Sequence, residues 1–167
     1  MPRIPFDDMP DHARLWVFAT DRPLGGSDQE TLLEVADGFL DGWAAHGAPL
    51  TCARELAHDR FLFIAVDEQA AGVSGCSIDA LVRSLKTLEQ QLDLALIDHS
   101  PVSYRHNGSI RRVSRGEFSE LVSRRAVTLE TTVFDNTIAT VGELRSGKWE
   151  VSAGDAWHGR AFFEIAP

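Results

Sequence analysis

The residues best equipped for chemistry lie in the segment 73–79, where a thiol, Cys76, stands between two hydroxyls, Ser74 and Ser77. The segment follows an uninterrupted apolar run, residues 61–66, and begins an amphipathic stretch. A strand followed by a helix places these side chains at a helix N-terminus, where backbone amides lack intrahelical acceptors. The sequence therefore predicts a small polar pocket at this point.

The predicted pocket allows two kinds of chemistry. The partial positive charge of a helix N-terminus stabilises a thiolate, so Cys76 is a candidate catalytic nucleophile. The same amides, with Gly75 and the hydroxyls of Ser74 and Ser77, would hold a phosphate or a carboxylate. The structural alternative is that Cys76 is a small buried residue and that the serines only cap the helix.

A second polar group lies near the end of the chain, in residues 155–160. A thiol nucleophile needs a base, and His158 is the candidate catalytic base because a carboxylate and a guanidinium accompany it. We predict that this segment is a loop or a strand end, with Asp155 and Arg160 as ligand-binding residues. The alternative is a packing role, in which Trp157 closes the core.

Asp135 and Asn136 form a third polar group, which interrupts an apolar region. They are candidate ligand-binding residues, although Asx side chains commonly bond their own backbone in turns. No spacing of histidines, cysteines and carboxylates indicates a metal site. The motifs G-x-x-x-x-G-K-[ST], G-x-G-x-x-G, G-x-S-x-G and H-E-x-x-H are absent, so we predict neither a metal nor a cofactor.

Charge is distributed unevenly along the chain, whose net charge is −9. Residues 1–100 hold 7 basic and 17 acidic side chains, whereas residues 101–167 hold 9 and 8. The acidic part repels nucleic acid, so that partner is not expected. The second part contains a cluster of arginines: Arg105, Arg111, Arg112, Arg115, Arg124 and Arg125. Either they form a solvated face, or they bind a phosphate or an acidic protein partner.

The length of 167 residues, with 44% hydrophobic and 25% charged side chains, is typical of one soluble globular domain. We predict a single domain over residues 1–167, with residues 1–13, rich in proline and acid, as a surface arm. No apolar run is long enough to span a membrane, and the N-terminus does not resemble a signal peptide. A cytoplasmic location is therefore expected, in which both cysteines are free thiols.

Hydrophobic periodicity and turn residues predict alternating strands and helices. The expected strands are residues 15–19, 51–56, 60–66, 102–106, 109–113, 128–134, 138–144 and 149–151. One expected helix begins with a capping box at Ser27 and ends near Gly47; a second covers residues 74–96; a shorter third begins at Ser114. Asn107 and Gly108 predict a tight hairpin turn, since both tolerate positive φ angles.

This order of elements predicts an α+β fold, with a mainly antiparallel sheet and two long helices. The first six elements match a ferredoxin-like split βαβ core, and residues 114–167 would form a β-rich extension. A different α+β sandwich with the same element order is the alternative.

Five short motifs occur together in residues 43–47, 66–68, 74–79, 133–137 and 155–158. Together they resemble a family of small uncharacterised bacterial proteins that often carries the label "ABC transporter ATPase", and the resemblance covers residues 16–162. The family has serine where this chain has Ala156, and it has no established activity that the resemblance would imply. An ATPase of that class needs Walker A, Walker B and signature motifs, and none is present, so ATP hydrolysis is not expected.

The function expected from these residues is that of a binding module. The pocket of Ser74, Cys76 and Ser77 would hold a small anion or the acidic group of a protein partner. One alternative is an enzyme that uses Cys76 as a thiolate and His158 as a base. Another is a protein–protein adaptor with residues 111–125 as its contact surface.

Overall fold

The computed structural model describes residues 3–69 and 72–163. Its contacts divide the chain into two compact units. Unit 1 contains residues 3–98 and 139–142, and unit 2 contains residues 99–138 and 143–163. The fold is α+β with antiparallel sheets, as predicted. The prediction of a single domain stays a prediction.

Unit 1 is built on a three-stranded sheet in the order β1-β5-β4. β1 (Arg14–Ala19) and β4 (Thr51–Ala57) each pair antiparallel with β5 (Phe61–Asp67), which lies between them. β1 and β4 therefore run parallel to each other on either side of β5. The predicted pairing of residues 51–56 with 60–66 is confirmed.

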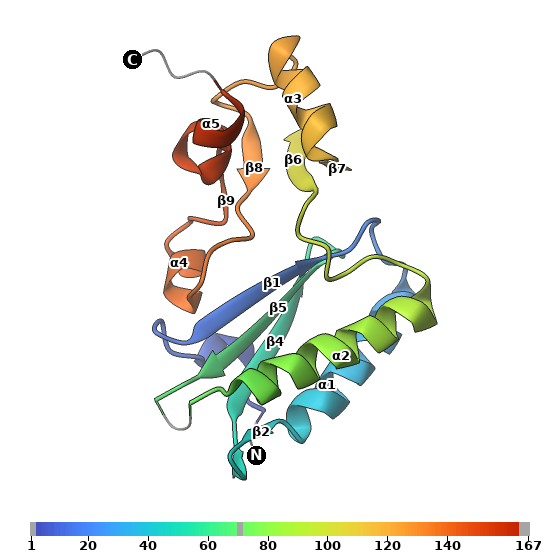
Figure 1. The fold of residues 1–167 in the computed structure, drawn as a ribbon, viewed down its shortest axis with the longest axis vertical. Helices are drawn as coiled ribbons and strands as arrows, with labels where there is room; N and C mark the ends of the chain where they lie inside the picture. The colour runs from blue at the N-terminus through green and yellow to red at the C-terminus, as the bar shows by residue number, and fades with distance from the viewer. Residues whose placement is uncertain (1–2, 70–71, 164–167) are drawn as a thin grey trace. The chain divides into compact units, whose positions relative to one another are not determined.

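The two long helices of unit 1, α1 (Gly26–Asp41) and α2 (Gly75–Leu92), lie side by side on one face of this sheet (Figure 1). Alternate residues of the central strand face them, and the core on this side is apolar. Its fully buried members include Leu32, Leu40, Leu62, Val66 and Leu88.

α1 differs from its prediction at both ends. Its N-cap is Gly25, with no side-chain bond, so the capping box predicted at Ser27 is wrong. The helix ends at Asp41, and the chain then forms a small hairpin, β2 (Ala44–Ala45) and β3 (Ala48–Pro49). Gly47, predicted as a helix cap, sits in the turn of this hairpin with a φ of 79°.

The segment predicted as a surface arm is packed more closely than expected. It contains a short 3-10 helix, η1 (Phe6–Asp8), in which Phe6 stacks on Phe63 of β5. Met9 is 1% exposed, and Ala13 is fully buried. The arm therefore covers the sheet face opposite the helices, while residues 1 and 2 lie outside the described residues. Because the segment is rich in proline and acidic residues, its sequence did not indicate that Phe6, Met9 and Ala13 would be buried.

Both edges of the unit 1 sheet are partly covered by short pairings. At one edge, the N–H of Ile4 donates to the carbonyl of Cys52 in β4 over 2.9 Å. At the other edge, the N–H of Leu15 in β1 donates to the carbonyl of Ala139 over 2.8 Å. These contacts limit the exposed backbone of an edge strand, which is otherwise prone to pair with other chains.

The strand predicted over residues 138–144 is wrong. Only a single bridge, Arg14 to Thr140, is present, and the chain then forms α4 (Val141–Arg145). Gly142 explains the change, because its N–H donates to the carbonyl of Asp11 over 2.8 Å. A Cβ at this position would lie 3.0 Å from the same oxygen. The close approach favours glycine at this position. The N–H groups of Val141 and Gly142 bond the carbonyls of Ala13 and Asp11 instead of a neighbouring strand.

The strand after α2 does not complete the unit 1 sheet. β6 (Val102–His106) belongs instead to the sheet of unit 2. A full ferredoxin-like core needs this strand beside β1, so that specific part of the fold prediction is not confirmed.

Unit 2 is built on a four-stranded sheet in the order β7-β6-β8-β9. The remaining strands are β7 (Ser109–Val113), β8 (Thr132–Phe134) and β9 (Glu150–Ser152). The predicted hairpin of β6 and β7 is confirmed, with Asn107 and Gly108 at φ angles of 50° and 81°. β8 is shorter than predicted, because Thr128 and Thr131 form a hydrogen-bonded turn before it.

α3 (Arg115–Ser123) follows β7 and begins as predicted. Ser114 is its N-cap, and the side-chain oxygen of Ser114 accepts from the N–H of Glu117 over 3.1 Å. One face of the helix buries Phe118, whose ring meets Tyr104 of β6 edge-on at 5.7 Å. This contact joins the helix to the sheet of unit 2.

The segment predicted as a loop over residues 155–160 is largely helical. A 3-10 turn, η2 (Ala153–Asp155), leads into α5 (Trp157–Phe162). Gly159 permits the packing of this helix on the turn, since a Cβ there would lie 2.8 Å from the carbonyl oxygen of Ala153. A six-residue segment is too short for its hydrophobic periodicity to distinguish a helix from a loop.

Among the described residues, no helix is both long and apolar enough to cross a membrane.

The close packing at Gly159 predicts a large effect of a single methyl group. Gly159→Ala should lower the free energy of unfolding by about 1–3 kcal/mol, because the carbonyl of Ala153 cannot move without disturbing η2. Gly116→Ala in α3 is the control, since its nearest heavy atom would be 3.9 Å away. Urea denaturation of both variants measures the difference. Equal stability of the two would contradict the packing described.

Candidate functional site

The start of α2 is organised by hydrogen bonds of Ser74 and Ser77. Ser74 is the N-cap of the helix, and its side-chain oxygen accepts from the N–H of Ser77 over 3.1 Å. The two hydroxyl oxygens lie 2.7 Å apart. Ser77 in turn donates its hydroxyl to the carbonyl of Ala44 over 2.9 Å. The hydroxyl proton of Ser74 is then directed at Ser77, so both protons bind protein oxygens.

Ser77 also anchors the helix through its backbone. Trp43 donates its indole N–H to the carbonyl of Ser77 over 2.9 Å. Trp43 is 3% exposed, and Ser77 is 4% exposed. The small hairpin carrying Ala44 is thus fixed to the first turn of α2, and the serines hold the structure together at this point. This is the structural role that the sequence left open for them.

Cys76 and Gly75 are the parts of the predicted pocket that remain accessible. Cys76 is exposed, not buried as the structural alternative assumed, and Gly75 is exposed beside it. The first turn of α2 contains no acidic residue. The first two amides of a helix have no intrahelical acceptor, so this surface offers a thiol and two N–H groups. The serine hydroxyls add no further donor to a ligand.

The second cysteine, Cys52, is chemically protected. It lies fully buried in β4 and donates its thiol to the carbonyl of Leu40 over 3.4 Å. Burial raises the pKa of the Cys52 thiol to about 12, and the nearby carboxylate of Asp41 adds to the rise. A thiolate is the reactive form of cysteine, so Cys52 is an internal standard for an unreactive thiol.

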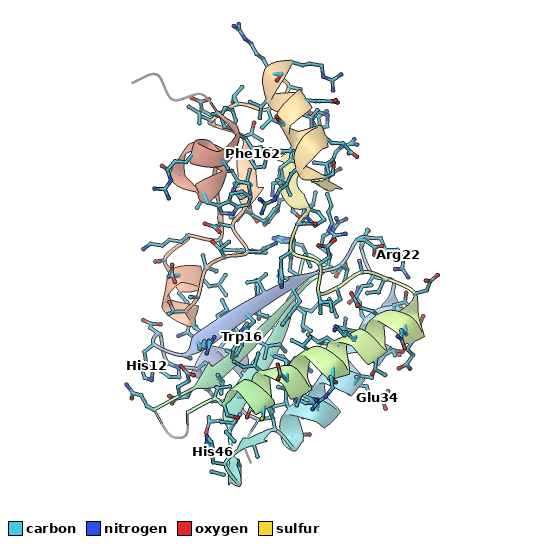
Figure 2. The ribbon with its side chains drawn as sticks, viewed as in Figure 1. His12, Trp16, Arg22, Glu34, His46 and Phe162 are labelled. Carbon is cyan, nitrogen blue, oxygen red and sulfur yellow. The ribbon has the colours of Figure 1, made fainter. Side chains whose placement is uncertain are left out.

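His158 is buried in the aromatic core of unit 2. It is 1% exposed, and its ring stacks on Trp157 at a centroid distance of 4.0 Å. The rings of Phe118 and Phe162 lie 6.1 and 6.5 Å away; Phe162, on α5, is labelled in Figure 2. The Nδ1 atom of His158 has no hydrogen-bond partner among the described residues.

This environment keeps the imidazole of His158 neutral. Burial lowers its pKa from 6.5 to about 4. The carboxylate of Asp135 raises that pKa, whereas the guanidinium of Arg115 lowers it further, and both effects are smaller than that of burial. A base for an exposed thiol has to reach solvent or substrate, so the burial of His158 weighs against the catalytic role proposed for it.

Asp135 and Asn136 form a turn with local bonds. The N–H and hydroxyl of Thr137 both donate to the carboxylate of Asp135. The amide oxygen of Asn136 accepts the indole N–H of Trp149 over 2.9 Å. Both polar side chains therefore have partners in unit 2, but only the bonds to Asp135 are those of a local turn.

The remaining predicted site residues lie at the surface of unit 2. Asp155 and Arg160 are exposed, at the end of η2 and in α5. Cys76 belongs to unit 1, whereas Asp135, Asp155, His158 and Arg160 belong to unit 2. Within unit 2, the carboxylate of Asp135 raises the pKa of His158. These two predicted site residues therefore interact electrostatically.

Comparison of the chain with protein-family models, with curated proteins and with solved structures found no match. The resemblance noted from the sequence motifs therefore stays an expectation. Within the described residues, no group of three or more histidines, cysteines and carboxylates is placed to hold a metal ion.

The arginines of unit 2 have different surroundings. Arg105 pairs with Glu150 over 3.2 Å and lies 5.5 Å from the ring centroid of Phe134. Arg115 donates to the carbonyl of Ser100 and lies 5.0 Å from the ring centroid of Trp157. Both arginines therefore make contacts within unit 2, although Arg115 is exposed.

Two further arginines lie at the end of α3. Arg124 is the C-cap of the helix, and Arg125 follows it in a left-handed conformation with a φ of 59°. Cations at this end of a helix stabilise it through the helix dipole. The helix dipole therefore accounts for the position of Arg124 and Arg125 without a ligand.

Arg111 is different, because it lies on an edge strand. β7 pairs only with β6 among the described residues, and Arg111 at its centre is exposed. No hydrogen bond or ion pair of its side chain occurs within the described residues. We call the outer side of β7, residues 109–113, the β7 edge. The sequence showed the arginines but not that this strand would end the sheet.

Sequence reasoning also missed an ion-pair cluster in unit 1. Asp37 of α1 accepts from two nitrogens of Arg54 over 2.7 and 2.9 Å and pairs with Arg3 over 3.3 Å. Arg3 also binds Asp41 over 2.8 Å. The hydrogen bond from Arg54 lowers the pKa of Asp37. Each charge has a counter-charge, and the cluster fixes the N-terminal segment to α1 and β4.

The contrast between the two thiols predicts selective alkylation. At pH 8, iodoacetamide should modify Cys76 completely while Cys52 reacts at least ~100-fold more slowly, because Cys52 reacts only after local unfolding. Peptide mass spectrometry over time measures both rates. Equal rates in the folded protein would contradict the burial of Cys52, and equal rates in urea are the control.

The buried neutral His158 predicts a pH-dependent stability. An unfolded histidine binds a proton near pH 6.5, whereas the folded one binds it only near pH 4, so stability is full above pH 6.5 and falls as the pH drops to 4. The expected loss from this residue is roughly 3 kcal/mol. Urea denaturation of the wild type and of His158→Phe between pH 7 and pH 4 measures it. The stability difference between them should shift by this amount, and parallel pH curves would contradict it.

Proposed function

We propose that the protein is a binding module that recognises an acidic segment of a protein partner through the β7 edge. The observation that supports this proposal is the exposed Arg111 at the centre of a strand that pairs on one side only. An edge strand offers backbone donors and acceptors to another chain. An unneutralised guanidinium beside that backbone favours a partner with carboxylates.

The charge of the chain supports the same class of partner. The whole chain carries a net charge of −9, so a wholly acidic protein would be repelled at long range. A short acidic segment presented to unit 2 meets a locally balanced surface, since residues 101–167 hold 9 basic and 8 acidic side chains. The proposal therefore concerns a local segment, not an acidic protein in bulk.

Charge reversal on β7 tests this function. Binding of a fluorescein-labelled, glutamate-rich peptide should weaken at least ~10-fold in Arg111→Glu, because the contact changes from attractive to repulsive. Fluorescence anisotropy at two salt concentrations measures the affinity, which should fall as salt rises.

The matched control is Lys148→Glu, which makes the same charge change. Lys148 is exposed and precedes β9, at the opposite edge of the same sheet. This variant should bind the peptide like the wild type. Equal weakening by both variants would mean that only the net charge of the unit matters, and the β7 edge would then not be the binding surface. No binding to the wild type would also reject the proposal.

A second candidate function uses the start of α2. The exposure of Cys76 beside the free amides of a helix that lacks acid in its first turn favours a reactive surface thiol, which would serve a cysteine-dependent enzyme or a small-anion site. Alkylation of Cys76 at pH 6.5 faster than that of free cysteine, and slowed by inorganic phosphate, would support it. A rate equal to that of free cysteine would leave Cys76 as an ordinary surface residue.

A further inference from the structure

The turn between β6 and β7 determines which backbone groups of β7 point outward. Asn107 and Gly108 form a two-residue turn, so His106 and Ser109 are a hydrogen-bonded pair. Antiparallel pairs alternate between hydrogen-bonded and non-hydrogen-bonded. Arg111 therefore directs its backbone toward Tyr104 of β6, and Ile110 directs its N–H and carbonyl away from the sheet.

The register also places the side chains of β7. Arg111 lies opposite Tyr104, and Ile110 lies opposite Arg105. Since successive side chains alternate between the faces of a sheet, Arg111 and Ile110 project from opposite faces. A strand added at the β7 edge would therefore meet Arg111 on one face, and Ile110 together with Arg112 on the other. Arg112 already has an interaction within the chain, so Arg111 is the cation offered to a partner.

The occupant of this edge is not a second copy of the chain. Antiparallel pairing of two β7 edges about Arg111, the central residue of the strand, would place the Arg111 side chains of both copies opposite each other. Like charges directly opposite each other on adjacent strands destabilise the pair. Arginine on an edge strand is thus a barrier to self-association and favours a strand that carries acid.

We propose that the acidic partner binds in extended form and adds a fifth strand, antiparallel to β7, to the sheet of unit 2; this rests on the proposed function. The partner residue opposite Arg111 is acidic, and its own backbone faces away from β7. The partner residue next to it, opposite Ile110, exchanges backbone hydrogen bonds with the N–H and the carbonyl of Ile110. Small or β-branched residues suit the positions that flank the acidic residue, since they favour extended backbone.

Backbone methylation of a probe peptide tests the binding mode. The probe is an end-blocked Thr-Glu repeat of about eight residues, long enough to cover a strand of ordinary length. Two methylated forms are compared, one with N-methyl groups on the threonine amides and one with them on the glutamate amides. Both forms keep the composition and charge of the parent, so each is the control for the other.

The register predicts a different result for each form. Glutamate side chains that face Arg111 place the threonine amides against Ile110, so methylation of threonine should weaken binding at least ~10-fold. Methylation of glutamate amides, which face away, should leave the affinity within ~2-fold of the parent, because no hydrogen bond to β7 is lost. Hydrogen exchange of the Ile110 amide should slow when the parent peptide binds.

The outcomes separate this inference from the proposed function. If Arg111→Glu weakens binding but both methylated peptides bind like the parent, the acidic partner binds by charge alone and strand addition is rejected. If glutamate methylation is the damaging one, the register is wrong and the inference is overturned. If the peptide does not bind the wild type, the proposed function itself fails.

Discussion

The burial of β5 on both faces is the constraint on which unit 1 depends. Its residues from Phe61 to Val66 are all at most 2% exposed, so each face of the strand has to be covered by other elements. Leu62 and Ile64 contact the helical side, and Phe63 contacts Phe6 of η1 on the other. A strand with no polar position cannot lie at a sheet edge without losing this burial. The pairing of β1 and β4 on its two sides follows from that requirement.

The polar groups at the start of α2 show how packing limits chemistry. The hydroxyls of Ser74 and Ser77 are directed at protein oxygens, and Trp43 uses the carbonyl of Ser77. A buried polar group without a partner costs free energy, so a serine in the core first satisfies the structure. Cys76 is one residue away on the exposed side of the helix, so its thiol does not need a hydrogen-bond partner within the protein. Adjacent residues in one motif can therefore differ in whether their side chains are accessible to a ligand.

The same reasoning separates the arginines of unit 2. Arg105 contacts the Phe134 ring and the Glu150 carboxylate, and Arg115 contacts the Trp157 ring and the carbonyl of Ser100. The helix dipole accounts for Arg124. Arg111 differs from these residues because it is exposed on a strand with one open side. The proposed partner surface thus rests on topology as well as on charge.

The sequence by itself determined the elements whose signals are local. The apolar run of β5, the Asn107-Gly108 turn and the Ser114 cap each depend on residues within a few positions, and all three are present as predicted. Tertiary structure alone decided the helix at Gly142, because its contact with Asp11 joins residues far apart in sequence. The candidate site divides in the same way. The sequence indicated the positions of a thiol, a possible base and several arginines. Only the packing decided which of them water or a partner can reach, since exposure depends on what the rest of the chain places above each residue.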